Sequence, residues 1–146
     1  MKIIIAGAHA IGTHLARLLS RSKEEITLID ESEERLASIG SDCDLLTMLG
    51  KPTSLKILRD AGVDDADLFI AVTPVESTNI TASILAKNLG AKRTVARVDN
   101  PEYMEPQARN SSRTWHQQAH LSRDACRRGH QQWIEDELGS PALGCA

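Results

Sequence analysis

Short apolar segments alternate with amphipathic segments along the first hundred residues. Five apolar runs have the length and composition typical of β-strands: Lys2–Ala6, Ile26–Ile29, Asp44–Leu49, Leu68–Val72 and Thr94–Val98. The segments between them carry apolar residues at helical spacing and predict four helices: Ala10–Ser22, Ser32–Ile39, Ser54–Ala61 and Glu76–Leu89. Strands that alternate with helices predict an α/β fold with a Rossmann-like, doubly wound parallel sheet. Because most of the strands are apolar throughout, we expect helices on both faces of the sheet.

Composition narrows the class of protein. The chain has 146 residues, of which 41% are apolar and 25% charged, as in an ordinary soluble globular domain. No apolar run approaches the roughly 20 residues of a membrane-spanning helix. The net charge of −3 argues against a nucleic-acid partner. Three cysteines fit neither a disulfide framework nor a zinc site, which favours a cytoplasmic location.

The turn after the first predicted strand resembles a dinucleotide-binding motif. Gly7-Ala8-His9-Ala10-Ile11-Gly12 has the first and third glycines of the G-x-G-x-x-G pattern, but His9 replaces the middle glycine. The first glycine permits the sharp turn, and the third permits close packing of the helix on the strand. The middle glycine usually lets a pyrophosphate approach the backbone, so His9 could either contact a phosphate or obstruct it.

An acidic residue ends the second predicted strand, as nucleotide binding requires. Asp30, followed by Glu31, stands where a carboxylate accepts the ribose hydroxyls of an adenosine. A carboxylate there would repel a 2′-phosphate, so NAD or NADH is expected rather than NADP, with ATP or ADP as alternatives. The turn and the acid together predict a nucleotide site, the alternative being a turn with only a structural role.

Further candidate residues follow the fourth and fifth strands: Thr73, Pro74, Glu76, Asn79 and Arg97. Thr73 and Glu76 have the spacing of a helix N-cap and its capping-box acid, so they could cap the next helix, contact a ligand, or do both. Arg97 is predicted inside the fifth strand, where its charge requires a ligand or a partner. The sequence shows no spacing typical of a nucleophile with its base or of a metal site, so no catalytic residue, no metal and no enzymatic activity are predicted.

The first 107 residues resemble a known family. The stretches that carry the resemblance are MKIIIAGAHAIGTHLARLLS, ITLIDESEERL and LGKPTSLKILRDAGVDDADLFIAVTPVESTNITASILAKNLGAKRTVARVDNPEYM. They are similar to the Trk-type potassium-uptake regulatory proteins, and more broadly to the KTN/RCK nucleotide-binding domains of potassium channels and transporters. The most specific part is AGVDDADLFIAVT with Glu76 and Asn79, followed by Ala96-Arg97-Val98 and Pro101-Glu102-Tyr103.

The resemblance implies a cytoplasmic, non-enzymatic nucleotide sensor. Such domains bind NAD(H) or adenine nucleotides, pair into homodimers or higher rings, and dock peripherally on the inner face of the plasma membrane. Their partner would be an integral-membrane potassium transporter subunit of the TrkH/KtrB type. By position, Gly7 and Gly12 match the phosphate turn, Asp30 the ribose acid, and Arg97 an arginine near the nucleotide. His9 and Lys51 depart from the family pattern. The alternatives to a nucleotide sensor are a small NAD-dependent oxidoreductase fragment or a truncated, non-functional remnant.

The last 39 residues differ in composition from the preceding 107. Residues 108–146 contain no lysine, no valine and one isoleucine, yet they hold both tryptophans and three of the five histidines. The resemblance implies a sixth strand here, which this segment does not supply. We therefore expect residues 1–107 to form the domain without its sixth edge strand, and residues 108–146 to be disordered or translated out of frame.

We predict that the reading frame of the coding DNA shifts by one base from about Ala108. Residues 114–126, TWHQQAHLSRDAC, can be encoded so that the next reading frame gives LGINKLIYPEMLA, in which LIYP has the composition of a strand. Sequencing the coding DNA checks this directly. Shifted-frame codons for residues 108–126 that yield no family-like peptide would exclude a frame change.

Overall fold

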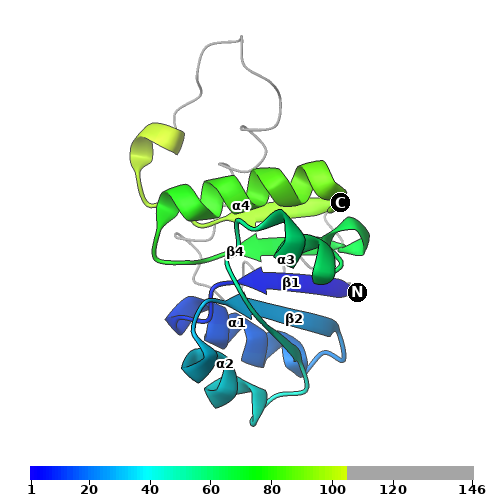
Figure 1. Ribbon diagram of the computed structural model, residues 1–146. Coiled ribbons are helices and arrows are strands. Elements are labelled where there is room, and N and C mark those ends of the chain that lie inside the picture. Colours follow the sequence, from blue (N-terminus) through cyan, green and yellow to red (C-terminus); the bar gives the residue numbers. More distant parts are fainter. Residues whose placement is uncertain (105–146) are drawn as a thin grey trace, which may run out of the picture. The chain divides into compact units, whose positions relative to one another are not determined.

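The first strand lies at the centre of a five-stranded parallel sheet. In the computed structural model, which describes residues 1–104, the strand order is β3-β2-β1-β4-β5 (Figure 1). The strands are β1 (Lys2–Ala6), β2 (Glu25–Asp30), β3 (Leu46–Leu49), β4 (Leu68–Ala71) and β5 (Arg93–Ala96). All four neighbouring pairs run parallel, and β1 pairs with both β2 and β4. The predicted Rossmann-like, doubly wound sheet with five strands is confirmed.

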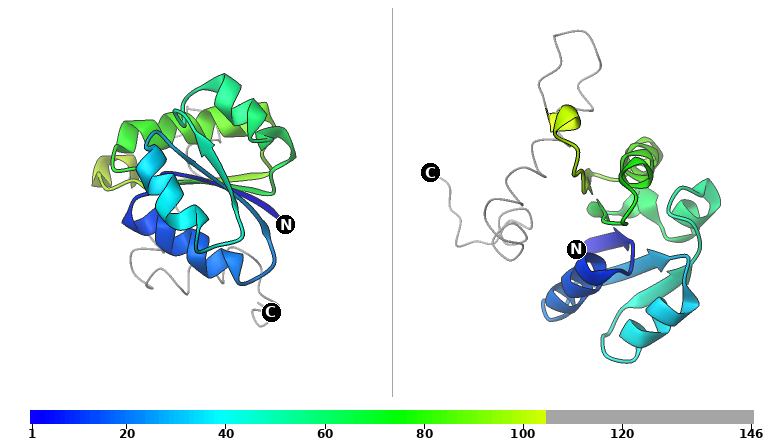
Figure 2. Two further views of the ribbon diagram at one scale, coloured as in Figure 1. Left: turned by 60° about the horizontal axis from the view of Figure 1, so that its bottom comes forward. Right: turned by 90° about the vertical axis from the view of Figure 1, so that its left-hand side faces the viewer.

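Each parallel connection contains a helix, as the alternating pattern predicted. The helices are α1 (Ala10–Ser20), α2 (Glu33–Gly40), α3 (Leu55–Asp60) and α4 (Glu76–Leu89), with short 3-10 turns η1 (Val63–Asp65) and η2 (Pro101–Met104). The two pairs α1/α2 and α3/α4 lie on opposite sides of the sheet (Figure 2). Among the described residues, those from Asn100 on, which include η2, belong to a separate unit from the sheet. The expected change at residue 108 and the missing sixth strand lie outside the described residues.

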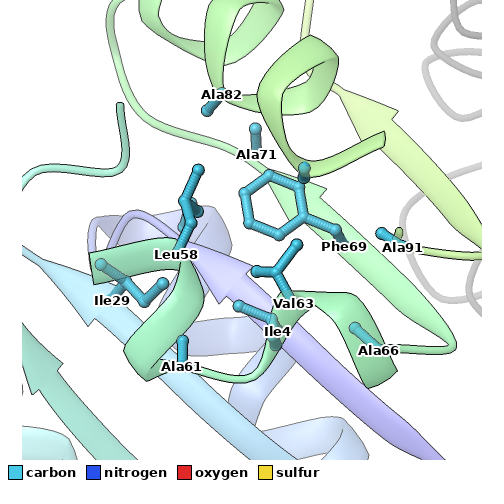
Figure 3. Packing of buried hydrophobic residues seen from close by; sticks show 12 residues of the cluster. Ile4, Ile29, Leu58, Ala61, Val63, Ala66, Phe69, Ala71, Ala82 and Ala91 are labelled. Atoms are coloured by element: carbon cyan, nitrogen blue, oxygen red, sulfur yellow. The ribbon is translucent and has the colours of Figure 1, made fainter. Parts of the chain in front are cut away.

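Alternate residues of the central strands build two cores. Ile4, Phe69 and Ala71 face α3 and α4, where they pack with Leu58 and Ala82 (Figure 3). Because side chains alternate along a strand, Ile3 and Ile5 face the other pair of helices. These isoleucines are fully buried, as are Leu15 and Leu19 of α1. The prediction that helices cover both faces is therefore confirmed for the central strands.

The edge strand β3 is less buried than the sequence pattern predicted. The sequence predicted a strand over Asp44–Leu49, whereas pairing with β2 begins at Leu46. Leu46 is 62% exposed and Leu49 is 52% exposed, because no strand in the described residues pairs with the outer edge of β3. Apolar composition marked this segment as a strand but did not reveal its edge position.

The sheet has a topological switch point between β1 and β4. The chain moves outward from β1 through β2 to β3, then crosses back to continue on the other side of β1 with β4 and β5. In such sheets ligands bind beyond the carboxyl ends of the strands at this point. The segments that follow β1 and β4, both predicted as site segments, therefore start side by side.

Close packing at the switch point requires two glycines. Gly7 has a φ of +110°, and a Cβ there would lie 3.0 Å from the backbone nitrogen of Thr73. A Cβ on Gly12 would lie 1.7 Å from the carbonyl oxygen of Gly7. The first turn of α1 therefore rests directly on the end of β1. This is the role expected of the first and third glycines of the motif.

Replacing Gly12 by alanine tests this packing. We expect Gly12→Ala to lower the free energy of unfolding by at least about 3 kcal/mol, because backbone rather than a flexible side chain blocks the added methyl group. Gly40→Ala in α2 is the matched control: its Cβ would meet only Thr47 Cγ2, at an ordinary 3.7 Å. We expect this control to be neutral or stabilising by about 0.5–1 kcal/mol. Urea unfolding measures both, and equal effects would contradict the packing argument.

Candidate functional site

The carboxylate of Asp30 joins the end of β2 to the turn after β1. Its Oδ2 accepts a hydrogen bond of 2.7 Å from the backbone N–H of Ala8. Its Oδ1 accepts one of 2.8 Å from the backbone N–H of Ser32, which begins the segment leading into α2. Asp30 is only 4% exposed. The acid predicted to bind ribose thus stands against the turn predicted to bind phosphate.

Arg35, in the first turn of α2, also binds this carboxylate. Its Nε lies 3.1 Å and its Nη2 2.9 Å from Oδ1 of Asp30. Burial by itself raises the pKa of Asp30, but the hydrogen bonds from Ala8, Ser32 and Arg35 outweigh it and hold the pKa below its usual value. Asp30 therefore carries a stable negative charge at neutral pH. The sequence pattern placed Arg35 within the predicted helix Ser32–Ile39 but did not predict this contact.

The N-terminus of α1 offers backbone amides beside this acid. His9 is the N-cap residue, and its side chain makes no capping hydrogen bond. No acidic residue lies in the first turn of α1. The first N–H groups of a helix have no acceptor within it, so those at Ala10, Ile11 and Gly12 are suited to a phosphate.

His9 fits the backbone of the turn. Its φ of −82° and ψ of −169° are extended values that any residue adopts. The missing middle glycine therefore causes no conformational strain at this position. Any effect of His9 on a ligand must come from its half-buried imidazole.

Asn79 fastens the segment after β4 to the segment after β5. Its Oδ1 accepts hydrogen bonds from the backbone N–H of Thr73 (2.8 Å) and from the Thr73 hydroxyl (2.7 Å). Its Nδ2 donates to the carbonyl oxygens of Thr73 (2.9 Å) and Arg97 (3.0 Å). Asn79 is 1% exposed, so its amide is fully used inside the protein. This geometry supports a role in positioning the loops.

Of the two roles left open for Thr73 and Glu76, the structure excludes the capping pair. The N-cap residue of α4 is Val75, and the Thr73 backbone N–H bonds to Asn79 rather than to a glutamate. Glu76 Oε2 instead accepts a 3.1 Å hydrogen bond from the backbone N–H of Asp99. The helix itself begins at Glu76, as the sequence predicted.

Arg97 lies just after β5, not inside it as predicted. The strand ends at Ala96, which is paired with Ala71, the last residue of β4. The guanidinium of Arg97 contacts the Asp99 carboxylate at 3.3 Å through both Nε and Nη2. Its side chain is 39% exposed. The pairing with Asp99 resolves the placement of this charge, which the sequence pattern left unexplained.

The structure separates the predicted residues into two groups. The first group lies at the carboxyl ends of β1 and β2 and consists of Gly7, Ala8, His9, Ala10, Ile11, Gly12 and Asp30. The second group lies at the carboxyl ends of β4 and β5 and consists of Thr73, Asn79 and Arg97. Contact between Gly7 and Thr73 links the groups. Glu31 and Pro74 are exposed beside them. Residues 1–104 contain no cluster of three potential metal ligands and no helix long and apolar enough to cross a bilayer.

Sequence comparison decides the family. The model of the TrkA-N domain family matches residues 3–111, which is most of the chain. This chain belongs to the TrkA-N family. The matched range includes every residue of both groups, and the resemblance noted in the sequence is confirmed.

Curated relatives of this TrkA-N domain are named as potassium uptake proteins. The "Trk system potassium uptake protein TrkA homolog" of Archaeoglobus fulgidus is 39% identical over 105 residues, which are 72% of this chain and 24% of that protein. The "Trk system potassium uptake protein TrkA" of Haemophilus influenzae is 42% identical over 105 residues, covering 71% and 23%. The chain thus spans about a quarter of the length of these relatives.

Solved structures share the fold of this TrkA-N domain. The NAD(P)-binding domain of an exopolyphosphatase-related protein from Archaeoglobus fulgidus aligns with a TM-score of 0.67 at 16% identity, covering 94% of this chain and 96% of that one. The GsuK channel bound to NAD aligns with a TM-score of 0.62 at 19% identity, covering 70% and 18%. A short-chain dehydrogenase/reductase from Veillonella parvula with NADP has a TM-score of 0.55 at 18% identity, covering 88% and 64%. At these identities the comparisons establish the Rossmann-like fold.

The Asn79 amide gives a prediction about stability. We expect Asn79→Ala to lower the free energy of unfolding by about 2–4 kcal/mol, because it leaves the Thr73 N–H and two carbonyl groups without their partner. Asn88→Ala is the control in the same helix, since Asn88 is exposed. Chemical unfolding of both variants measures the difference. A cost for Asn79→Ala no larger than that of the control would show that the four bonds contribute little.

Proposed function

We propose that this TrkA-N domain is a nucleotide-binding regulatory domain of a potassium uptake system and not an enzyme. One observation carries the proposal: the family match covers the glycine turn at residues 7–12, Asp30, and the segments that follow β4 and β5. The names of the relatives supply the link to potassium uptake. We infer NAD or NADH as the nucleotide, with ATP or ADP as alternatives at the same position.

The proposed contacts follow the two groups of residues. The pyrophosphate would lie at the N-terminus of α1, where the amides and the helix dipole favour negative charge. The ribose would lie at Asp30, next to Ala8. The remaining proposed contacts come from Glu31, Thr73, Pro74, Glu76 and Arg97. Among these, Asn79 holds Thr73 and Arg97 in place.

Regulation requires coupling between the nucleotide and a partner. A nucleotide can shift a transporter only if it binds two conformations of the regulator with different affinities. The proposed partner is an integral-membrane potassium transporter subunit of the TrkH/KtrB type, reached by a cytoplasmic homodimer or ring at the inner face of the plasma membrane. An oxidoreductase needs an acid or base beside the hydride acceptor, whereas a sensor does not. Because the sequence predicts no such catalytic residue, we favour a sensor over an oxidoreductase.

Calorimetric titration of the full chain with NADH, NADPH, ADP and ATP tests the nucleotide site. We expect NADH to bind and Asp30→Asn to weaken it by about 10-fold or more, because a hydrogen bond to a charged acceptor contributes about 1.5–3 kcal/mol. Asp42→Asn is the control, since Asp42 is exposed and its carboxylate has only weak surface contacts in the described residues, a 3.8 Å ion pair with Arg17 and a 3.4 Å hydrogen bond from Ser41. Thermal melts verify that each variant is folded.

Three outcomes of this titration would change the proposal. Absence of binding by any of the four nucleotides would refute the nucleotide site. Consumption of NADH during incubation would favour the oxidoreductase alternative over a sensor. Binding that appears only in His9→Gly would show that the imidazole obstructs the turn, and would favour a remnant that has lost its ligand.

A further inference from the structure

The carboxylate of Asp30, the proposed ribose ligand, already accepts hydrogen bonds from other groups of the protein. Oδ2 of Asp30 accepts the Ala8 N–H, and Oδ1 accepts the Ser32 N–H together with Nε and Nη2 of Arg35. Each carboxylate oxygen has two lone pairs. Among residues 1–104, three donors therefore saturate Oδ1, and one donor leaves Oδ2 a single free position.

A ribose needs more than this single position. Its 2′- and 3′-hydroxyls are adjacent donors, and the acid of a dinucleotide site accepts hydrogen bonds from the ribose. To accept both hydroxyls, Asp30 must release one of its present partners. The donors of Ala8 and Ser32 are backbone amides fixed by the turn and by the start of α2. Arg35 is a side chain with rotatable bonds, and it is 41% exposed.

We propose that Arg35 is a displaceable latch on Asp30, which closes the ribose position in the free protein and must swing away when a nucleotide binds. The inference rests on the proposed nucleotide site. The latch acts against any nucleotide with free 2′- and 3′-hydroxyls. It also offsets the charge of Asp30, so it reduces the repulsion of a 2′-phosphate. Arg35 therefore sets both the affinity of the site and its discrimination between NADH and NADPH.

Arg35→Met tests the latch, because methionine keeps much of the aliphatic stem and removes the charge and the donors. In the full chain, we expect this variant to bind NADH about 3- to 10-fold more tightly than the unmodified protein, since no partly exposed ion pair has to break. We expect no increase in NADPH affinity, because the unshielded Asp30 carboxylate repels the 2′-phosphate of NADPH. The NADH-to-NADPH preference therefore rises, which a merely structural role of Arg35 would not produce.

Two further variants complete the design. Arg35→Lys keeps the charge but not the paired donors, and we expect its NADH affinity to lie between those of the unmodified protein and Arg35→Met. It also preserves the test if the methionine variant does not fold. Arg17→Met is the matched control: it removes an arginine that is 56% exposed and whose ion pair with Asp42 is unrelated to Asp30. We expect no change in nucleotide affinity for this control.

The results separate the latch from the nucleotide site itself. If the unmodified protein binds NADH and Arg35→Met binds it equally or more weakly, the latch is refuted and the nucleotide site stands. The latch is also refuted, and the nucleotide site stands, if Arg17→Met increases NADH affinity as much as Arg35→Met does. If no nucleotide binds the unmodified protein or any folded variant, the proposed function fails and the latch fails with it.

Discussion

The hydrogen bond between the Asp30 carboxylate and the Ala8 N–H is the contact on which the site depends. It fixes the turn after β1 relative to the end of β2, two segments that are 22 residues apart in sequence. A carboxylate that is 4% exposed is costly unless its oxygens find donors, and here the turn, the start of α2 and Arg35 supply them. The group best placed to bind a ribose is therefore also a group that the fold needs to satisfy.

Small residues and backbone groups make the rest of the switch point. Gly7 lies against Thr73, and Gly12 lies against the Gly7 carbonyl, so any side chain at either glycine would push these segments apart. Asn79 then ties the segments after β4 and β5 through backbone atoms of Thr73 and Arg97. The amides and carbonyls at this edge are therefore held in place, so the proposed nucleotide would meet donors that are already oriented.

Hydrophobic pattern and turn chemistry predicted the strands, the helices, the glycine turn and the acid, because these depend on local spacing. The pattern did not predict the end of β5, which is set by pairing Ala96 with Ala71 rather than by composition. It also missed Arg35 as a partner of Asp30. That contact depends on a side-chain conformation and on the approach of α2, although an arginine five residues after the acid was a usable signal. Asn79 was selected as a ligand contact, yet its amide faces inward toward two loops.

Under the proposed function, Asp30 serves both the fold and the ligand, and this would connect binding to conformation. A regulator needs a group whose partners differ between two states, since a ligand that contacts both states equally shifts nothing. Under the proposed latch, Asp30 exchanges its donor on α2, Arg35, for a ligand donor, whereas its bonds to Ala8 and Ser32 persist. The change would then be confined to Arg35 and to the helix that carries it. Since α2 packs on β2 and β3, the conformational signal would leave the site toward the β3 edge rather than toward α4 and β5.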